Sequence, residues 1–258
     1  MFSLFRKKAR KNSPPIILGM VMLRDADSFD AILFMDDLKL HISPVIGDPS
    51  GGNDALTFSV DGELVAIGVM PVPIPKGELE ANAPYAYNWM NALEDVSSHQ
   101  AHLIVTVMGG SGTSVKRHRV FTEVIASLLR TTAAIGVYMG SQSLLIPTDD
   151  YLAEAEMMSD DQYPLNLWIY FGLRSSDGKG SGYTHGLKQF NKLEMEIVDS
   201  DKSLEDIRGF LFNMSHYVLD YDVVFKHGQT CGMSETERCP ITISKGVNLD
   251  QETIKIGY

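Results

Sequence analysis

The sequence predicts an α+β protein in which largely antiparallel or mixed sheets are flanked by amphipathic helices. A tight two-residue hairpin signal joins adjacent strands, short apolar runs are typical of buried strands, and longer segments repeat apolar residues at helical spacing. The strands follow one another in runs instead of alternating regularly with helices, which argues against a doubly wound parallel sheet. We divide the 258 residues into a basic flexible tail at 1–12, an N-terminal α+β subdomain at 13–140 and a C-terminal α+β subdomain at 141–258.

The first predicted elements are a strand over Ile16–Leu23 and a helix that begins after Ser28 and ends near Leu40. The strand is apolar nearly throughout, and Ser28 is a residue type favoured at helix N-caps. The predicted core-facing residues of this helix are Phe29, Ile32 and Leu33.

A hairpin over residues 56–70 is the clearest local feature. Leu56, Phe58 and Val60 alternate with small or polar residues, and Asp61-Gly62 is a residue pair that favours positive φ. The segment 71–75 follows, in which every second residue is Pro, so that it lacks alternate backbone donors and is expected to be extended. A helix from about Pro84 to Val96 is predicted next.

The middle of the chain predicts a buried strand over His102–Met108, an amphipathic helix over Val115–Arg130 and a strand over Ala134–Met139. Thr148 is expected to cap a helix that ends near Met158. The further predicted strands are Leu165–Leu173, Tyr183–Phe190, Leu193–Val198 and Val223–Phe225. Before the last strand, Ser203 and Asp206 form a capping-box pattern that predicts a long helix.

The charge is strongly asymmetric along the chain. Lys and Arg total 22 against 33 Asp and Glu, and five of the basic residues lie in the first dozen, so the remainder has a net charge of −16. Such an acidic body repels phosphate backbones, which excludes duplex nucleic acid as an expected partner and favours a basic protein. The sequence also predicts no transmembrane segment and no export signal, which together with only two Cys residues indicates a cytoplasmic protein. It does not determine the oligomeric state.

A glycine-rich turn, Gly109–Ser114, is the best candidate for a ligand site. It lies between a predicted strand and a predicted helix, where backbone amides can bind phosphate, with Gly110, Gly112 and Ser114 as candidate contacts. However, the turn lacks the Lys-Ser/Thr ending of a P-loop and the third Gly of a dinucleotide fingerprint. We therefore expect a structural turn and keep phosphate binding as the alternative.

We predict no catalytic residue, metal or cofactor. The pair His99 and His102 and the set His227, Cys231 and Cys239 do not have the spacing of a zinc site. Cys231 would need an activating base, for which His227 on an adjoining strand is a candidate.

An aromatic cluster, Tyr85, Tyr87 and Trp89, follows the proline-rich segment. It can belong to the core or, if it is exposed beside acidic residues, form a protein-recognition surface. The candidate partner-binding residues are Glu78, Glu80, Tyr85, Trp89 and Glu94.

The C-terminal half resembles a known family. The segments that carry the resemblance are 183–197, which opens with Tyr-Thr-His-Gly-Leu-Lys-Gln-Phe, 210–219 and 228–232. They resemble a bacterial family designated domain of unknown function 4261. The segments 70–75 and 102–106 resemble the region upstream of this domain in longer members, so the resemblance spans most of the chain. Gln229 and Cys231 depart from the family pattern, which has an acidic and an aliphatic residue there. The resemblance implies a bacterial cytoplasmic protein with no established catalytic residues and an association with toxin and secretion loci.

The sequence thus leads to two hypotheses. The first is a non-enzymatic binding protein, such as an immunity or adaptor protein for a basic secreted effector. The alternative is a small-molecule enzyme or sensor that binds a phosphorylated ligand at the Gly109–Ser114 turn.

Overall fold

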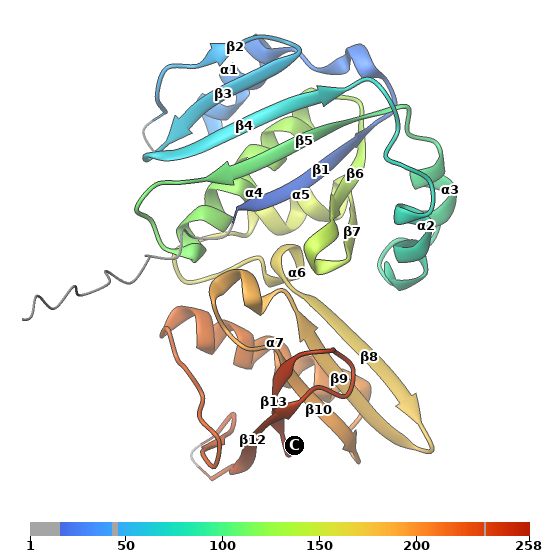
Figure 1. The fold of residues 1–258 in the computed structure, drawn as a ribbon, viewed down its shortest axis with the longest axis vertical. Helices are drawn as coiled ribbons and strands as arrows, with labels where there is room; N and C mark the ends of the chain where they lie inside the picture. Colours follow the sequence, from blue (N-terminus) through green and yellow to red (C-terminus); the bar gives the residue numbers. More distant parts are fainter. Residues whose placement is uncertain (1–15, 43–45, 235) are drawn as a thin grey trace, which may run out of the picture.

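A computed structural model describes residues 16–42, 46–234 and 236–258, and it confirms the α+β class. The described chain forms a seven-stranded and a six-stranded sheet (Figure 1). The predicted basic tail lies outside the described residues.

The first sheet has the strand order β2-β3-β4-β5-β1-β6-β7, and all its neighbouring strands are antiparallel. Its strands are β1 (Ile17–Leu23), β2 (Ser50–Gly51), β3 (Ala55–Val60), β4 (Glu63–Met70), β5 (Ala101–Met108), β6 (Ala134–Met139) and β7 (Leu144–Pro147). The predicted hairpin joins β3 and β4, with Asp61 at φ 49° and Gly62 at φ 81°.

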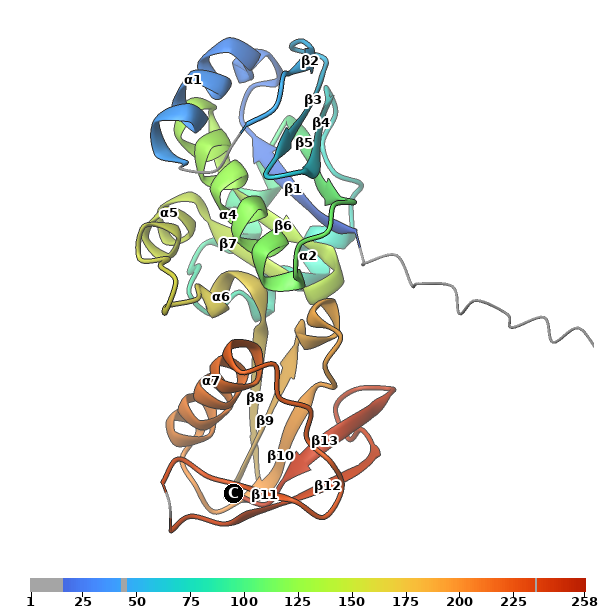
Figure 2. The ribbon, with the colours of Figure 1, turned by 90° about the vertical axis from the view of Figure 1, so that its left-hand side faces the viewer.

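Helices cover both faces of this sheet. The helices α1 (Ala31–His41), α4 (Ser114–Thr131) and α5 (Thr148–Glu156) lie along one face (Figure 2). The short helices α2 (Glu78–Asn82) and α3 (Ala92–Ser97) cover part of the other. Side chains of β1 alternate between the two cores, since Val21 packs in the large core and Met22 packs with α2 and α3.

The start and the buried face of α1 differ from the prediction. The N-cap is Asp30, whose side chain accepts hydrogen bonds from the backbone N–H groups of Ile32 and Leu33, and Ser28 instead ends a short 3₁₀ turn. Ile32 and Leu33 are 75% and 54% exposed. Phe29 is buried but lies before the helix, so its position does not indicate which face of α1 is buried. The buried face of α1 is Ala31, Phe34, Met35 and Leu38.

The single helix predicted over 84–96 is wrong. The chain forms α2, a 3₁₀ turn over Ala83–Tyr85 and then α3, separated by irregular backbone. Ala86 leaves the helical region with φ −82° and ψ 68°. Tyr85 and Trp89 therefore do not share a helix face.

The second sheet has the order β11-β12-β13-β10-β9-β8, with β10 and β13 parallel and the other neighbours antiparallel. Its strands are β8 (Tyr170–Ser176), β9 (Lys179–His185), β10 (Met195–Ser200), β11 (Thr230–Cys231), β12 (Cys239–Lys245) and β13 (Glu252–Ile256). The helix α7 (Leu204–Asp220) packs against β8 and β9, and Ser203 caps it as predicted by accepting the N–H of Asp206.

Two predicted strands of the C-terminal half are corrected. Residues 165–173 form the short helix α6 (Leu165–Trp168) before β8 begins, and the described chain has no strand over 223–225. The indole of Trp168 is buried, and its N–H donates to the Thr122 hydroxyl of α4 at 2.9 Å. Tertiary packing of Trp168 thus stabilises a local structure that the apolar run does not predict.

The two sheets share a continuous core. Trp168 is 1% exposed and packs against His118 of α4, with ring centroids 5.6 Å apart. The boundary predicted at residue 140 lies between β6 and β7, which pair within the first sheet, and the second sheet begins at Tyr170. Within the described ranges, no helix has the length and apolar character needed to cross a membrane.

Candidate functional site

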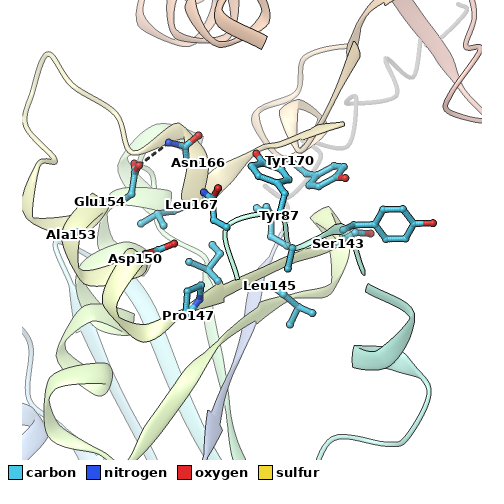
Figure 3. Close-up of a pocket in the computed structure, with 15 residues that line it drawn as sticks. Tyr87, Ser143, Leu145, Pro147, Asp150, Ala153, Glu154, Asn166, Leu167 and Tyr170 are labelled. Carbon is cyan, nitrogen blue, oxygen red and sulfur yellow. Dashed lines mark hydrogen bonds between the residues drawn. The ribbon is translucent and has the colours of Figure 1, made fainter. Parts of the chain in front are cut away.

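A cavity of about 290 Å³ lies where the first sheet meets the start of the second (Figure 3). The 3₁₀ turn before Ala86, the strand β7, the helices α5 and α6 and the start of β8 contribute its walls. We call it the tyrosine cavity. Its lining residues are Tyr85, Ala86, Tyr87, Asn88, Ser143, Leu144, Leu145, Ile146, Pro147, Asp150, Ala153, Glu154, Asn166, Leu167 and Tyr170.

Aromatic rings form one wall of the tyrosine cavity. The ring centroids of Tyr87 and Tyr170 are 6.4 Å apart, and the ring of Tyr183 lies edge-on to Tyr170 at 6.1 Å. Tyr85 and Tyr87 are 61% and 57% exposed, so their rings are accessible from solvent. Burial, followed by the neighbouring phenols, raises the pKa of Tyr170 to about 12, so its hydroxyl is neutral at physiological pH.

Two carboxylates of α5 also line the tyrosine cavity. Asp150 and Glu154 are one helical turn apart, and both are half-buried. The Oε1 atom of Glu154 accepts a hydrogen bond from Nδ2 of Asn166 at 2.7 Å (Figure 3). Oδ1 of Asn166 accepts in turn from Nη2 of Arg208 at 2.7 Å, which fixes the orientation of the amide.

This arrangement favours a positively charged group. The faces of aromatic rings carry partial negative charge, and the fifteen lining residues include two carboxylates but no Lys or Arg. A cationic group in the cavity would be attracted by both the ring faces and the carboxylates, whereas an anion would be repelled by them. The cavity is at the small end of the size range of small-molecule sites, so it suits a single side chain or a compact cation.

The predicted partner-binding residues are only partly brought together here. Tyr85 lines the tyrosine cavity, but Trp89 is 8% exposed, and its indole N–H donates to Asp95 at 2.6 Å. Trp89 packs in the smaller core beneath α2 and α3, which is the core alternative given for this aromatic residue.

The acidic residues Glu78, Glu80 and Glu94 lie on α2 and α3 and do not line the cavity. Glu80 has a local role, because its carboxylate accepts the N–H of Gly77 at 2.7 Å and caps α2. These backbone hydrogen bonds lower the pKa of Glu80.

Sequence reasoning missed Asp150, Glu154 and Tyr170. An acidic pair four residues apart on a predicted helix was the available signal for the first two, but the helix dipole also explains acids in a first turn. Tyr170 lies in a segment predicted to be buried strand. Only the packing of α5 against α6 and β8 brings the three side chains together.

The glycine-rich turn is filled by a side chain of the same protein. The N–H of Gly112 donates to Oε1 of Glu63 at 2.8 Å, and Glu63 is fully buried. A Cβ atom at Gly110 or Gly112 would lie 2.3 or 2.6 Å from the Glu63 carboxylate. The glycines therefore make room for an internal carboxylate, which would repel a phosphate bound to the same amides.

The histidine pair has a structural role. Nε2 of His99 accepts the N–H of Ile74 at 2.7 Å, and Nδ1 of His102 donates to the carbonyl of Val72 at 2.9 Å. Both rings hold the proline-rich segment against the first sheet. Burial lowers the pKa of His102, which keeps its ring neutral.

Cys231 and Cys239 are free thiols opposite each other in β11 and β12. Burial raises the pKa of Cys231 to about 12, so the thiolate needed for nucleophilic attack is scarce. Nδ1 of His227 accepts the N–H of Ile243 and so serves the backbone. In the part of the chain that the structure describes, no group of three or more His, Cys, Asp or Glu side chains is arranged to hold a metal ion.

The structure is thus a two-sheet α+β protein with a cavity lined by tyrosine rings and two carboxylates. Residues 183–257 match the model of the family described as Domain of unknown function (DUF4261), which confirms the resemblance in the C-terminal part of the chain. No curated protein has a sequence that matches the chain significantly.

Two buried glutamates account for several of the residues that carry the resemblance. Glu194 is 1% exposed and accepts hydrogen bonds from the Thr184 hydroxyl at 2.8 Å and from the backbone N–H of Gly186 at 2.9 Å. Glu196 is fully buried and accepts the N–H of Asn248 at 2.7 Å and the Thr253 hydroxyl at 2.8 Å. These carboxylates fix two loops of the second sheet, so this part of the matched segment has a structural explanation.

Proposed function

We propose that this protein is a non-enzymatic binding protein that recognises a basic segment of another protein. An immunity or adaptor protein for a basic effector would act in this way. The observation that carries the proposal is the tyrosine cavity, in which aromatic rings and two carboxylates surround a space of about 290 Å³ without any basic lining residue.

The cavity suits the end of a Lys or Arg side chain. A cation over a tyrosine ring gains about 0.5–1 kcal/mol at an exposed site and about 2 kcal/mol when it is desolvated. Asp150 adds charge attraction, and its carboxylate has no hydrogen-bond partner among the described residues, so that it is available to a ligand. Arg gains most, because its planar guanidinium can stack on a ring and pair with a carboxylate at the same time.

A protein segment is favoured over a free small cation because exposed aromatic and apolar residues lie at the cavity edge and in the segment that follows it. Tyr85 and Tyr87 are exposed at its edge, and Met90 and Leu93 nearby in sequence are 98% and 55% exposed. Exposed aromatic and Met side chains are typical of protein-recognition surfaces. The net charge of −16 outside the first dozen residues would steer a basic partner toward the protein.

The proposal can be tested by affinity purification from cells of the source organism. Tagged wild type is compared with Asp150→Asn and Tyr87→Ala. The matched controls are Asp149→Asn, an exposed neighbour on the same helix turn, and Tyr221→Ala, an exposed tyrosine on the second sheet's side.

The expected result is a stoichiometric basic protein that copurifies with wild type and both controls and is lost with both cavity variants. A bound protein that the cavity variants retain, or a bound partner that is acidic, would contradict the proposal. Native mass spectrometry of the purified complexes identifies the stoichiometry.

A further inference from the structure

A buried guanidinium lies at the start of α4. Arg117 is 2% exposed, and its Nη2 atom makes one long hydrogen bond to the Ser114 hydroxyl at 3.3 Å. Its Nε and Nη1 atoms have no hydrogen-bond partner among the described residues. A buried charge without a partner is costly, so this side chain is suited to receive an anion.

A second cavity adjoins Arg117. It has a volume of about 920 Å³, and its lining includes the glycine turn at 110–113, the first turn of α4, the segment 190–192 and the end of α7 with the loop that follows. It therefore lies between the two sheets, and it shares no lining residue with the tyrosine cavity. We call it the α4 cavity.

The helix adds to the positive potential of the α4 cavity. The first-turn backbone N–H groups of an α-helix lack partners within the helix, and α4 has 18 residues over which its peptide dipoles align. Lys192 also lines the cavity, with its Nζ atom bonded to Asp222 at 2.6 Å and to the carbonyl of Val223 at 2.9 Å.

Two carboxylates lie at the edge of the same cavity, and their negative charge opposes the binding of an anion. Asp222 pairs with Lys192, and its side chain is 94% exposed, so water screens its charge. Asp220 is exposed and accepts the Tyr163 hydroxyl at 3.3 Å. The side chains of Arg117 and Lys192 are the buried charges that line this cavity, whereas Asp220 and Asp222 are exposed at its rim. The fully buried Glu63 lies behind the glycine turn and opposes an anion at that end of the cavity.

We propose that the α4 cavity binds the phosphate group of a small phosphorylated molecule, with Arg117 as its main contact. The guanidinium can pair with phosphate oxygens, and its unpartnered Nε and Nη1 groups are available as donors. The glycine turn also lines this cavity, but its Gly112 amide already holds Glu63, so we assign the phosphate contact to Arg117 and not to the amides of the turn. The volume of the α4 cavity exceeds what a phosphate ion requires, which leaves room for the organic part of a phosphorylated ligand. The residues Tyr163 and Phe190 line the cavity and would contact that organic part.

The test uses inorganic phosphate as the probe. Thermal unfolding of the wild type is followed in increasing phosphate, with sodium chloride at matched ionic strength as the reference, and the dissociation constant is measured by isothermal titration calorimetry. The variants are Arg117→Met and, as a matched control on the same helix, Arg119→Met, whose side chain pairs with the exposed Asp160.

We expect phosphate to raise the melting temperature of wild type and of Arg119→Met above the chloride reference. Arg117→Met is expected to lose this response and to bind at least about tenfold more weakly. It should be no less stable than wild type without phosphate, because the uncompensated buried charge is gone. A wild type that responds to phosphate no more than to chloride, or an Arg117→Met variant that keeps the response, would overturn the proposal.

If Arg117→Met does not fold, Asp222→Asn tests the same site in the opposite direction. This variant removes an exposed negative charge and frees Lys192 from its ion pair. Phosphate should then bind more tightly than to wild type, by about threefold or more. An unchanged or weaker affinity would overturn the proposal, and neither outcome depends on the tyrosine cavity.

Discussion

At the scale of single residues, buried carboxylates organise the loops of this protein. Glu63, Glu194 and Glu196 are each at most 1% exposed, and each accepts at least one backbone N–H group. A buried carboxylate is stable only when such donors compensate for lost hydration. The loops around these residues are therefore fixed by side chains as much as by strand pairing.

The glycine turn gives the first prediction. Gly109 and Gly110 both have positive φ, but only at Gly110 would a Cβ atom meet the Glu63 carboxylate. Gly109→Ala should lower the free energy of unfolding by about 1 kcal/mol through backbone strain alone. Gly110→Ala should cost at least about 1 kcal/mol more, because Glu63 must move. Urea unfolding measures both, and equal losses would contradict the role assigned to Glu63.

Glu123 provides a prediction on pH. Burial raises its pKa to about 7, with Arg119 opposing and Asp61 adding to the shift. An acid with a raised pKa stabilises the fold most when it is protonated, so this contribution is complete below about pH 4.5 and is lost as the pH rises through 7. Glu123→Gln should therefore be more stable than wild type above pH 7, by about 1 to 3 kcal/mol.

The measurement for Glu123 is urea unfolding between pH 5 and 8. The difference between Glu123→Gln and wild type should grow with pH across this window. Glu156→Gln removes an exposed carboxylate near the same surface and serves as the control, with a difference expected to stay flat. A flat difference for Glu123→Gln would show that its carboxylate is hydrated in the folded protein.

Cys231 should be a slow nucleophile. A pKa of about 12 leaves about one thiolate in 10⁴ at pH 8, far less than in an unperturbed cysteine. Alkylation by iodoacetamide, followed by mass spectrometry, should be at least about a hundredfold slower in the folded protein than in urea. Comparable rates in the two states would mean that burial does not protect the thiol.

At the scale of elements, the β3–β4 hairpin is held by local backbone geometry. Gly62 has φ 81°, and a Cβ atom there would meet nothing within 4 Å. Gly62→Val should therefore cost about 1 kcal/mol or more through backbone strain, since a β-branched residue disfavours positive φ. At Gly52 a Cβ atom also meets open space, but φ is not positive, so Gly52→Val is the matched control. An unchanged unfolding midpoint for Gly62→Val would contradict this explanation.

Elements with a local signal could be predicted from the sequence, and elements that depend on tertiary packing could not. The hairpin, α4 and the capped α7 follow from turn chemistry and apolar period. The predictions for 84–96 and 165–173 were wrong because two buried Trp side chains make contacts remote in sequence. Trp89 packs in the smaller core with β1 and β6, and Trp168 donates to Thr122 of α4. The same reason limits prediction of the site, since Tyr87, Asp150 and Tyr170 meet only in the folded chain.

At the scale of the whole molecule, both cavities lie between segments of the two sheets. The tyrosine cavity joins β7 and α5 to α6 and β8, and the α4 cavity joins the start of α4 to the loop after α7. The buried contact of Trp168 with Thr122 and His118 holds this junction together. A ligand at either cavity would therefore contact both parts of the fold and stabilise their association.

The central claim is that the tyrosine cavity recognises a cation on a basic partner. The most direct measurement is the dissociation constant of the purified partner, determined by calorimetry for wild type, Asp150→Asn and Asp149→Asn. We expect Asp150→Asn to weaken binding about tenfold, equivalent to about 1.4 kcal/mol, and Asp149→Asn to change it less than threefold. Equal effects of the two substitutions would mean that only the overall acidic charge attracts the partner and would contradict recognition in the cavity.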